Sequence, residues 1–361
     1  MFYKTLTLVI FMIFGSCCIA HAADTALFVW NLDKKQVLSS KSQIDKLINF
    51  SHQKKIKTLF VQVYRANKAW FPTRRADTHD YDYFHQGSNN DSFTYLIKEA
   101  HKRGIKVHAW MNMLSLSANT EAPILKKYGT GILTQNQEAK KTLEDYKIDG
   151  QLFLEPSDSR VHKELLILVE DLLKRQKDLD GIQFDYIRYP DVHPFYGYSS
   201  NNIERFKKQA KVDKVTEEDP MWKQFKRDQV TDLLKALVKK VRSLRPEIQI
   251  STTGCLSYSR AYHEALQDWP AWLKNNLIGF VTVMNYPPDL PEFKKNVEEI
   301  KLKLGENFEN VNIAVGAYKF VQHDTKVFKE QFQYCQQSNS KGCVVFHYSN
   351  LSQDPALANV I

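Results

Sequence analysis

Short apolar runs alternate with amphipathic segments along most of the chain. The apolar runs are rich in β-branched and aromatic residues, which is typical of buried strands. The amphipathic segments repeat their apolar positions every three to four residues, which indicates helices with one buried face. The strands are predicted at 27–32, 57–65, 105–112, 182–189, 248–254, 278–286, 311–318 and 342–348. The helices are predicted at 43–54, 92–103, 161–177, 221–244, 262–275, 292–304 and 327–337.

This alternation of buried strands and helices favours an α/β fold, a closed (β/α)8 TIM barrel with a parallel sheet. An open doubly wound sheet is the main alternative, but no GxGxxG sequence follows the first strand to suggest the nucleotide site of that fold. Regular periodicity weakens at 114–153 and 194–220. We interpret these stretches as extended βα loops, the first with a short extra strand at 151–156.

The N-terminus has the pattern of a secretory signal peptide. Lys4 precedes an apolar run at 6–19, and Ala20-His21-Ala22 is a small-residue cleavage signal. The apolar run is too short to span a bilayer, which needs roughly 20 residues, and no later segment comes close. We therefore predict cleavage after Ala22, a single barrel domain at 23–361, and an exported protein, periplasmic or extracellular, with no transmembrane segment in the mature chain.

A lipoprotein anchor is the alternative reading of the same segment. Cys17 and Cys18 would offer an acylation site, but Phe14-Gly15-Ser16 lacks the usual upstream Leu. The small-residue cleavage signal fits better.

Composition and charge narrow the function classes. The chain is 43% hydrophobic and 12% aromatic, which is typical of a globular protein with an excess of aromatic residues. Its formal charge is +9, yet the Lys and Arg residues are dispersed over amphipathic helices as solvated faces. We therefore expect no nucleic-acid partner.

Three cysteines remain after the predicted cleavage. Cys335 and Cys343 are close enough in sequence to form a small-loop disulfide in an oxidising compartment, if their geometry permits it, and Cys255 would then be unpaired. No CxxC pair and no His/Cys spacing suggests a structural zinc site. We predict no metal and no cofactor.

The fourth strand carries the strongest candidate chemistry. It begins apolar after Gly181 and turns polar abruptly, with Asp185, Arg188 and Asp191 at its end. Pro190 cannot continue the ladder beyond Tyr189. In a (β/α)8 barrel the carboxyl ends of the strands carry the catalytic groups, so Asp185 is a candidate catalytic acid. The alternative is a strand-end carboxylate that caps a loop or pairs with Arg188.

Residues that finish the other strands would share the same rim of the barrel. They are unusually polar and aromatic for buried runs, and such side chains stack on sugar rings and hydrogen-bond to hydroxyl groups. The pattern therefore indicates a rim that binds a carbohydrate. The predicted substrate-binding residues are Trp30, Asn31, Gln62, Arg65, His108, Trp110, Asn112, Arg188, Asn285, Tyr286, His347 and Tyr348.

Glycoside cleavage commonly requires two carboxyl groups, one ionised and one that donates a proton to the leaving oxygen. Asp185 is the candidate for the first role. Asp289, just beyond the sixth strand, is the provisional acid, with Glu155 behind it and Glu264 also in competition. Whether configuration is retained or inverted depends on the separation of the two groups.

Several sequence blocks resemble the glycosyl-hydrolase-like 10 family of bacterial envelope barrels, and the resemblance runs in order from about residue 26 to 351. The most specific are the block ending Glu99-Ala-His-Lys-Arg-Gly104 with the strand after it, and Asp180-Gly-Ile-Gln-Phe-Asp185. The others are Phe60-Val-Gln-Val63, Val107-His-Ala-Trp-Met-Asn112, Trp269-Pro-Ala-Trp272 and Gly279-Phe-Val-Thr-Val-Met-Asn-Tyr286.

The resemblance implies a TIM-barrel glycosidase acting on bacterial polysaccharide, with peptide-free peptidoglycan glycan strands as one substrate known in the family. It also implies that Asp185 is the strand-four acid and that His108, Trp110 and Asn112 line the substrate site. Two positions depart from the family pattern. Tyr186 stands where a second Asp is common, and the second strand reads Gln62-Val-Tyr-Arg65 where QVR is expected.

Our main hypothesis is a secreted, cofactor-independent glycoside hydrolase. The alternative is a glycan-binding barrel that has kept the aromatic groove and lost a carboxylate, and it predicts binding without cleavage. A third hypothesis, a metal-dependent polysaccharide deacetylase, needs Asp and His ligands that converge, and His108 and Asp185 would be candidates.

Overall fold

The computed structural model describes residues 23–32, 36–85, 91–192 and 195–361. The predicted signal peptide, residues 1–22, lies outside the described residues. The chain is organised around a nine-stranded sheet, in which all pairings are parallel except that of β3 with β2. The other eight strands close on themselves, because β1 pairs with both β2 and β11. These strands are β1 (Asp24–Val29), β2 (Thr58–Arg65), β4 (Lys106–Asn112), β7 (Gly181–Asp185), β8 (Gln249–Gly254), β9 (Phe280–Asn285), β10 (Val311–Gly316) and β11 (Gly342–Phe346). The predicted (β/α)8 barrel is confirmed.

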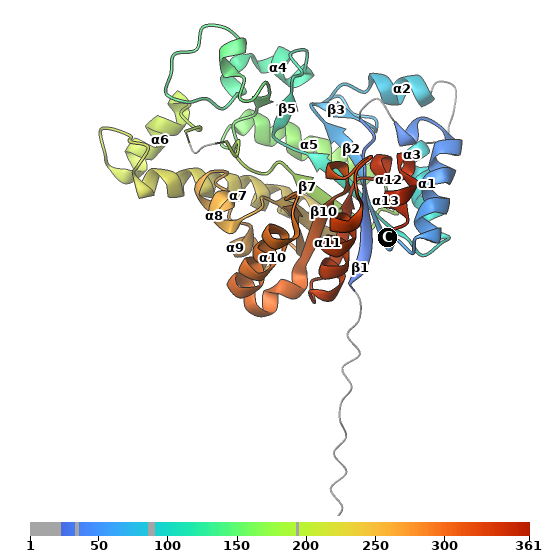
Figure 1. The fold of residues 1–361 in the computed structure, drawn as a ribbon. Coiled ribbons are helices and arrows are strands. Elements are labelled where there is room, and N and C mark those ends of the chain that lie inside the picture. The colour runs from blue at the N-terminus through green and yellow to red at the C-terminus, as the bar shows by residue number, and fades with distance from the viewer. Residues whose placement is uncertain (1–22, 33–35, 86–90, 193–194) are drawn as a thin grey trace, which may run out of the picture.

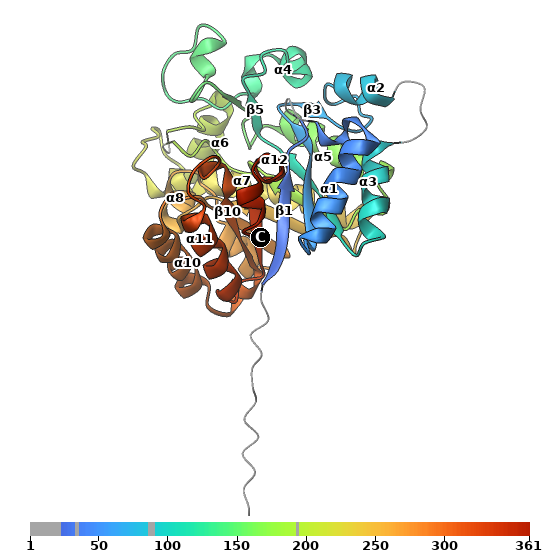
Figure 2. The same ribbon diagram turned by 45° about the vertical axis from the view of Figure 1, so that its right-hand side comes forward.

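Helices surround the barrel, as Figures 1 and 2 show. They connect successive strands and bury one face against the outside of the sheet. In α5, for example, Val161, Leu165, Leu168 and Leu172 are buried at the spacing that the sequence predicted. The helices that follow the barrel strands are α1 (Lys41–Gln53), α3 (Ser92–His101), α5 (Ser159–Arg175), α7 (Pro220–Leu244), α8 (Tyr258–His263), α9 (Trp269–Lys274), α10 (Leu290–Leu304), α11 (Lys326–Gln337), α12 (Tyr348–Gln353) and α13 (Pro355–Ala358).

Additional elements lie at the end of the barrel where the strands finish, opposite the start of β1 (Figures 1 and 2). β5 pairs antiparallel with β6, so the predicted extra strand at 151–156 exists but is shorter. α6 belongs to the insertion after β7. The additional elements are β3 (Lys68–Ala69), β5 (Ser115–Ser117), β6 (Leu152–Phe153), α2 (His79–His85), α4 (Pro123–Tyr128) and α6 (Ser200–Ala210), with short 3-10 turns at Val37–Ser39, Thr130–Ile132, Glu144–Tyr146 and Ala317–Lys319. A further 3-10 turn, Gly305–Asn310, leads into the start of β10 at the other end of the barrel.

Two predicted elements differ from the structure. The predicted helix at 262–275 is two helices, α8 and α9, because Leu266 adopts a positive φ of 53° and Asp268 caps a new helix whose first turn contains Pro270. The fourth strand was predicted to reach as far as Tyr189, but β7 ends at Asp185. The reason is Tyr186, which has a φ of 54° and therefore leaves the extended conformation.

The hydrophobic core has two main parts. The larger part lies between the sheet and the helices, and a smaller cluster fills the inside of the barrel. A polar layer also lies inside, where Gln183 accepts hydrogen bonds from the hydroxyl groups of Ser251 (3.1 Å) and Thr282 (3.2 Å). The barrel is thus packed throughout. The interior cluster consists of Ala26, Phe28, Phe60, Trp110, Phe280, Ala314 and Val344.

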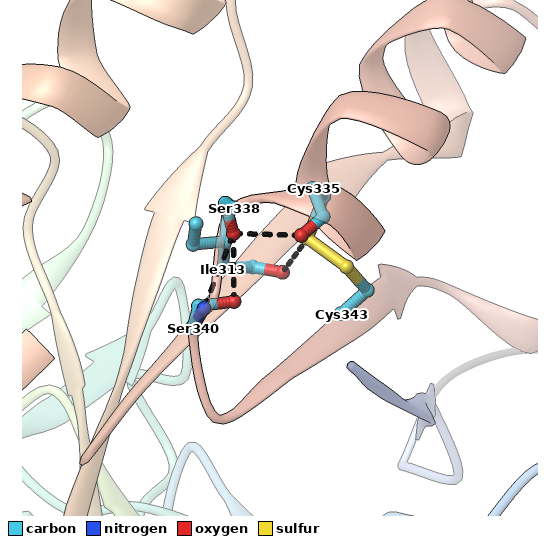
Figure 3. The surroundings of a disulfide bond; sticks show 5 residues. All are labelled: Ile313, Cys335, Ser338, Ser340 and Cys343. Carbon is cyan, nitrogen blue, oxygen red and sulfur yellow. Dashed lines mark hydrogen bonds between the residues drawn. A yellow bond between two sulfur atoms is a disulfide. The ribbon is translucent and has the colours of Figure 1, made fainter. Parts of the chain in front are cut away.

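A disulfide bond joins Cys335 in α11 to Cys343 in β11, which confirms that the two residues can pair (Figure 3). The bond ties a helix to the strand that follows it. Ser338, in the connecting turn, donates a hydrogen bond of 2.7 Å to the carbonyl oxygen of Cys335. Cys255 is buried and unpaired.

Candidate functional site

A cavity of about 210 Å³ opens at the carboxyl ends of the barrel strands. Its walls combine aromatic rings with polar side chains, and they come from strands that are far apart in the sequence. Because the strands are parallel and the barrel is closed, their last residues meet at one mouth. The lining residues are Trp30, Gln62, Arg65, Trp110, Asn112, Ser115, Ser117, Asp185, Tyr186, Met284, Tyr286 and Phe346.

Asp185, the last residue of β7, is the only carboxylic acid among these lining residues. One of its oxygens accepts hydrogen bonds from Trp110 Nε1 (2.9 Å) and Asn112 Nδ2 (2.8 Å). The other accepts from the backbone N–H of Tyr186 (2.7 Å) and from the Thr253 hydroxyl (2.5 Å). In its ionised form the side chain can accept all four bonds, so the carboxylate is held in a fixed orientation in a site where it is 4% exposed.

The polar contacts continue from Asp185 across the neighbouring strands. Gln62 in β2 donates to Asn112 Oδ1 (2.9 Å), and it accepts a hydrogen bond from the backbone of Leu32 (3.3 Å). A chain of amides therefore runs from the loop after β1 to the acid on β7. These hydrogen bonds fix the orientation of both side-chain amides. Asn112 donates to Asp185 and accepts from Gln62, and Gln62 in turn accepts from the backbone of Leu32.

Aromatic rings form the opposite walls. Phe346 lies 5.8 Å from Trp30, 5.4 Å from Tyr286 and 6.1 Å from Trp110, measured between ring centroids. Burial, with a smaller contribution from the charge of Asp185, raises the pKa of Tyr286 well above its usual value. The phenol is therefore neutral and can donate a hydrogen bond. Rings and neutral donors beside one acid are the groups that bind a sugar.

Tyr186 adds a further aromatic group, and the sequence did not identify it as a site residue. The guanidinium of Arg188 lies 4.5 Å from its ring centroid, and Arg188 also pairs with Asp191 at 2.8 Å. Burial raises the pKa of Tyr186. Arg188 thus supports the Tyr186 ring and does not itself line the cavity.

Six of the predicted substrate-binding residues line this cavity, namely Trp30, Gln62, Arg65, Trp110, Asn112 and Tyr286. The others, besides Arg188 and His108, do not line it. Asn31 accepts a hydrogen bond from Leu38 N (2.8 Å), and Asn285 donates to the carbonyl of Phe293 (3.1 Å). His347 packs against the Trp30 ring at 4.5 Å, and Tyr348 lines a separate cavity between α1 and α12.

His108, also predicted for this site, does not line the same cavity as the other residues. His108 lies in the first half of β4, where its register partner is Gly181 at the start of β7. It lines a different cavity, formed by the amino ends of the strands. Burial is the main reason that the pKa of His108 falls to about 4. His108 and Asp185 therefore do not converge, as a metal site shared between them would require.

None of the three proposed partner acids lines the cavity with Asp185. Asp289 is exposed and caps α10, accepting a hydrogen bond from Glu292 N (2.8 Å). Glu155 is 1% exposed and accepts from the Tyr189 hydroxyl (2.6 Å) and Asn202 Nδ2 (3.0 Å). Glu264 lies 3.6 Å from Arg260 in an ion pair.

Sequence reasoning missed several contributors to the site. Phe346 immediately precedes the predicted His347, so it carried the signal of an aromatic strand end, as Thr253, another strand-end residue expected at the rim, carried that of a polar one. Ser115 and Ser117 come from β5, in a stretch that had been interpreted only as a loop. Their position depends on the pairing of β5 with β6, which no local pattern indicated.

No group of three or more His, Cys, Asp or Glu side chains is placed to hold a metal ion among the described residues. Across the same ranges, no helix combines the length and the apolar character needed to cross a membrane.

Known proteins resemble this chain in sequence. The profile of a family described as glycosyl hydrolase-like 10 matches residues 25–333. The glycosyl hydrolase DigH of Escherichia coli strain K12 is 24% identical over 274 residues, a match that covers 70% of this chain and 59% of DigH. The chain therefore spans less than two thirds of the length of that relative.

Solved structures resemble it in fold. A β-galactosidase from the psychrophilic Marinomonas ef1 has a TM-score of 0.62 at 9% identity, covering 90% of this chain and 54% of that one. The catalytic domain of a β-amylase from Paenibacillus polymyxa has a TM-score of 0.56 at 9% identity, covering 92% and 94%. At such low identity the likeness is one of fold.

Proposed function

The chain belongs to the glycosyl hydrolase-like 10 family, and on that premise we propose that it is an exported glycoside hydrolase of a bacterial envelope polysaccharide. Peptide-free peptidoglycan glycan strands are the substrate that we propose to test first. Export is supported by the N-terminal sequence and by the Cys335–Cys343 disulfide, since such bonds persist in oxidising compartments.

The observation that carries the proposal is the placement of Asp185. An acid held by four donors stands in a cavity with aromatic walls, at the end of the barrel where TIM-barrel enzymes have their active sites. Glycoside cleavage passes through a transition state with positive charge on the sugar ring. A fixed, buried carboxylate stabilises that charge, either at a distance or as the attacking nucleophile.

The partner acid in this proposal is Asp289. It follows the lining residue Tyr286 by three positions, in the loop between β9 and α10. Because it lies outside the lining set, that loop would have to close over a bound glycan. Glu155 takes second place, since it is buried outside the cavity and its Oε1 already accepts hydrogen bonds from Tyr189 and Asn202.

A specific observation also favours a second candidate function, a glycan-binding barrel without catalysis. The four hydrogen bonds to Asp185 use both of its oxygens, and no other acid lines the cavity among the described residues. A carboxylate so occupied can orient a sugar-binding wall without reacting. This candidate predicts that the chain retains glycans and releases no products.

The test is incubation of the purified mature chain with peptidoglycan, peptide-free glycan strands and exopolysaccharides, with products identified by mass spectrometry. We expect Asp185→Asn to lower the rate at least a hundredfold, within the range of about 10²–10⁴ that a catalytic acid or base contributes. Asp232→Asn, on the exposed side of α7, is the matched control and should keep the wild-type rate. Equal rates for Asp185→Asn and the wild type would remove Asp185 from the mechanism. Binding without any product would favour the second candidate.

A further inference from the structure

Arg65 stands out among the residues that line the cavity. Its guanidinium lies 5.3 Å from the ring centroid of Trp30, and it forms no ion pair and no hydrogen bond with any described residue. Arg65 and Asp185 are the two charged lining residues, and they do not form an ion pair with each other. The guanidinium of Arg65 therefore lies at the cavity wall beside an aromatic ring, with no acidic side chain bound to it.

A β-bulge aims this side chain into the cavity. Gln62 is paired with Trp110 and Tyr64 with Met111, so β2 carries one extra residue relative to β4. Val63 and Tyr64 consequently both pack in the core outside the sheet, while Gln62 and Arg65 both line the cavity. Without the bulge, strict alternation would place Arg65 on the outer face together with Val63.

The other arginine close to the cavity is already paired with an acid. Arg188 is paired with Asp191, which also lies 3.1 Å from Arg260. The oxygens of Asp185 already accept hydrogen bonds, three of them from N–H groups of Trp110, Asn112 and Tyr186. Arg65 alone among these charged residues has its donors available for a ligand.

We propose that Arg65 is the receptor for a carboxylate on the substrate sugar, so that the cavity selects acidic glycans. This inference rests on the proposed function and names its substrate class. A guanidinium offers a planar fork of N–H donors that matches the two oxygens of a carboxylate. Trp30 holds one face of that fork by a cation–π contact, and neighbouring rings are free to stack on the sugar.

Two kinds of sugar carry such a group. One is a sugar with a lactyl ether, as in the muramic acid of peptide-free glycan strands, and the other is a uronic acid. In the first kind an attached peptide converts the carboxylate into an amide and removes its charge. The cavity would therefore discriminate between peptide-free and peptide-bearing strands through Arg65.

The experiment measures binding, so that it is independent of hydrolysis. Affinities are determined by isothermal titration calorimetry for peptide-free glycan strands, for the same strands with their carboxyl groups converted into methylamides, and for a polyuronate. The measurements use the full mature chain and are repeated on the Asp185→Asn background, where turnover is suppressed. Wild type, Arg65→Gln and Arg65→Lys are compared, and Arg74→Gln, an exposed arginine in the loop that follows β2, is the matched control.

We expect the wild type to bind the acidic strands or the polyuronate at least tenfold more tightly than the methylamide strands, as a charge-assisted hydrogen bond provides. Arg65→Gln should abolish that preference, Arg65→Lys should keep part of it, and Arg74→Gln should keep all of it. The acidic glycan that shows the Arg65-dependent preference identifies the source of the carboxylate.

Three results would overturn the inference: equal affinity of the wild type for acidic and amidated strands, an equal loss of both affinities in Arg65→Gln, or no binding of either acidic glycan. Carboxylate-dependent binding without cleavage would leave the inference standing and refute the hydrolase. Thermal unfolding of each variant verifies that a lost affinity does not come from a lost fold.

Discussion

The imidazole ring of His108 lies directly against the backbone of Gly181, so closely that a Cβ at position 181 would stand 2.2 Å from His108 Nδ1. The contact joins the first half of β4 to the first residue of β7. It explains why the fourth strand begins with glycine, because any side chain there would displace the ring from the barrel interior.

We therefore predict that Gly181→Ala destabilises the barrel by about 1–3 kcal/mol, the usual cost of overpacking a filled core. Urea unfolding measures it. Gly131→Ala is the matched control, since its Cβ would meet Arg160 at an ordinary 3.6 Å, and it should change stability little. Truncating the ring in Gly181→Ala/His108→Ala should recover part of the loss. If the urea concentration at the unfolding midpoint were unchanged in Gly181→Ala, the close contact between His108 and Gly181 would be refuted.

His108 also makes stability depend on pH. Burial lowers its pKa from 6.5 to about 4, with Lys106 and Lys341 acting in the same direction and Asp180 opposing them. Between these two values the unfolded chain binds more protons than the folded chain, so the free energy of unfolding falls as the pH drops from about 6.5 to about 4. The contribution of this residue is at most about 3 kcal/mol.

Denaturant unfolding between pH 4 and pH 7 measures this slope. His108→Gln should flatten it, whereas His323→Gln, at an exposed position, should reproduce the wild-type profile. A wild-type slope retained in His108→Gln would show that other groups carry the pH dependence.

The disulfide makes a separate contribution. Its loop is short, with a sequence separation of 8, and closing such a loop in the unfolded chain is worth about 2–3 kcal/mol. Cys335→Ser/Cys343→Ser should lose that amount in urea unfolding, and a reductant should destabilise the wild type but not the double variant. If reductant left the wild type unchanged, the bond would have no role in stability.

Asp289→Asn tests the proposed partner acid. Asn caps helices about as well as Asp, so the variant should keep the stability of α10. If Asp289 donates the proton to the leaving oxygen, glycan hydrolysis falls by about 10²–10⁴-fold, and an aryl glycoside with a good leaving group loses much less. Hydrolysis rates of Asp289→Asn and Glu155→Gln, each measured on the glycan and on the aryl glycoside, show which of the two acids donates the proton. Equal loss on both substrates would argue against a proton-donor role.

The sequence predicted the fold well because most barrel strands contain short runs of β-branched and aromatic residues, and burial on both faces leaves that signature. It also placed His108, Trp110 and Asn112 correctly on one face of β4, since alternation gives the face. Alternation does not give depth along the barrel axis. That depth depends on how β4 is staggered against β7, so only Trp110 and Asn112 reach the mouth.

Other features of the site depend on backbone departures that have no local signature. The positive φ of Tyr186 ends β7 early and turns its ring into the cavity. The bulge before Tyr64 is visible only in the pairing with β4, so the sequence alone could not establish where Arg65 points. Asp289 and Glu155 lie in loops, where the partners that fix a side chain are distant in sequence.

The insertion after β7 has a small apolar centre of its own, in which Tyr198, Phe206, Trp222 and Phe225 pack together, apart from the two parts of the barrel core. Cohesion of this kind makes α6 and the start of α7 a cooperative unit that can open and reclose while the sheet stays intact. Substitutions, insertions and deletions in that unit are absorbed locally. The insertion can thereby vary over evolutionary time without endangering the scaffold that holds the acid.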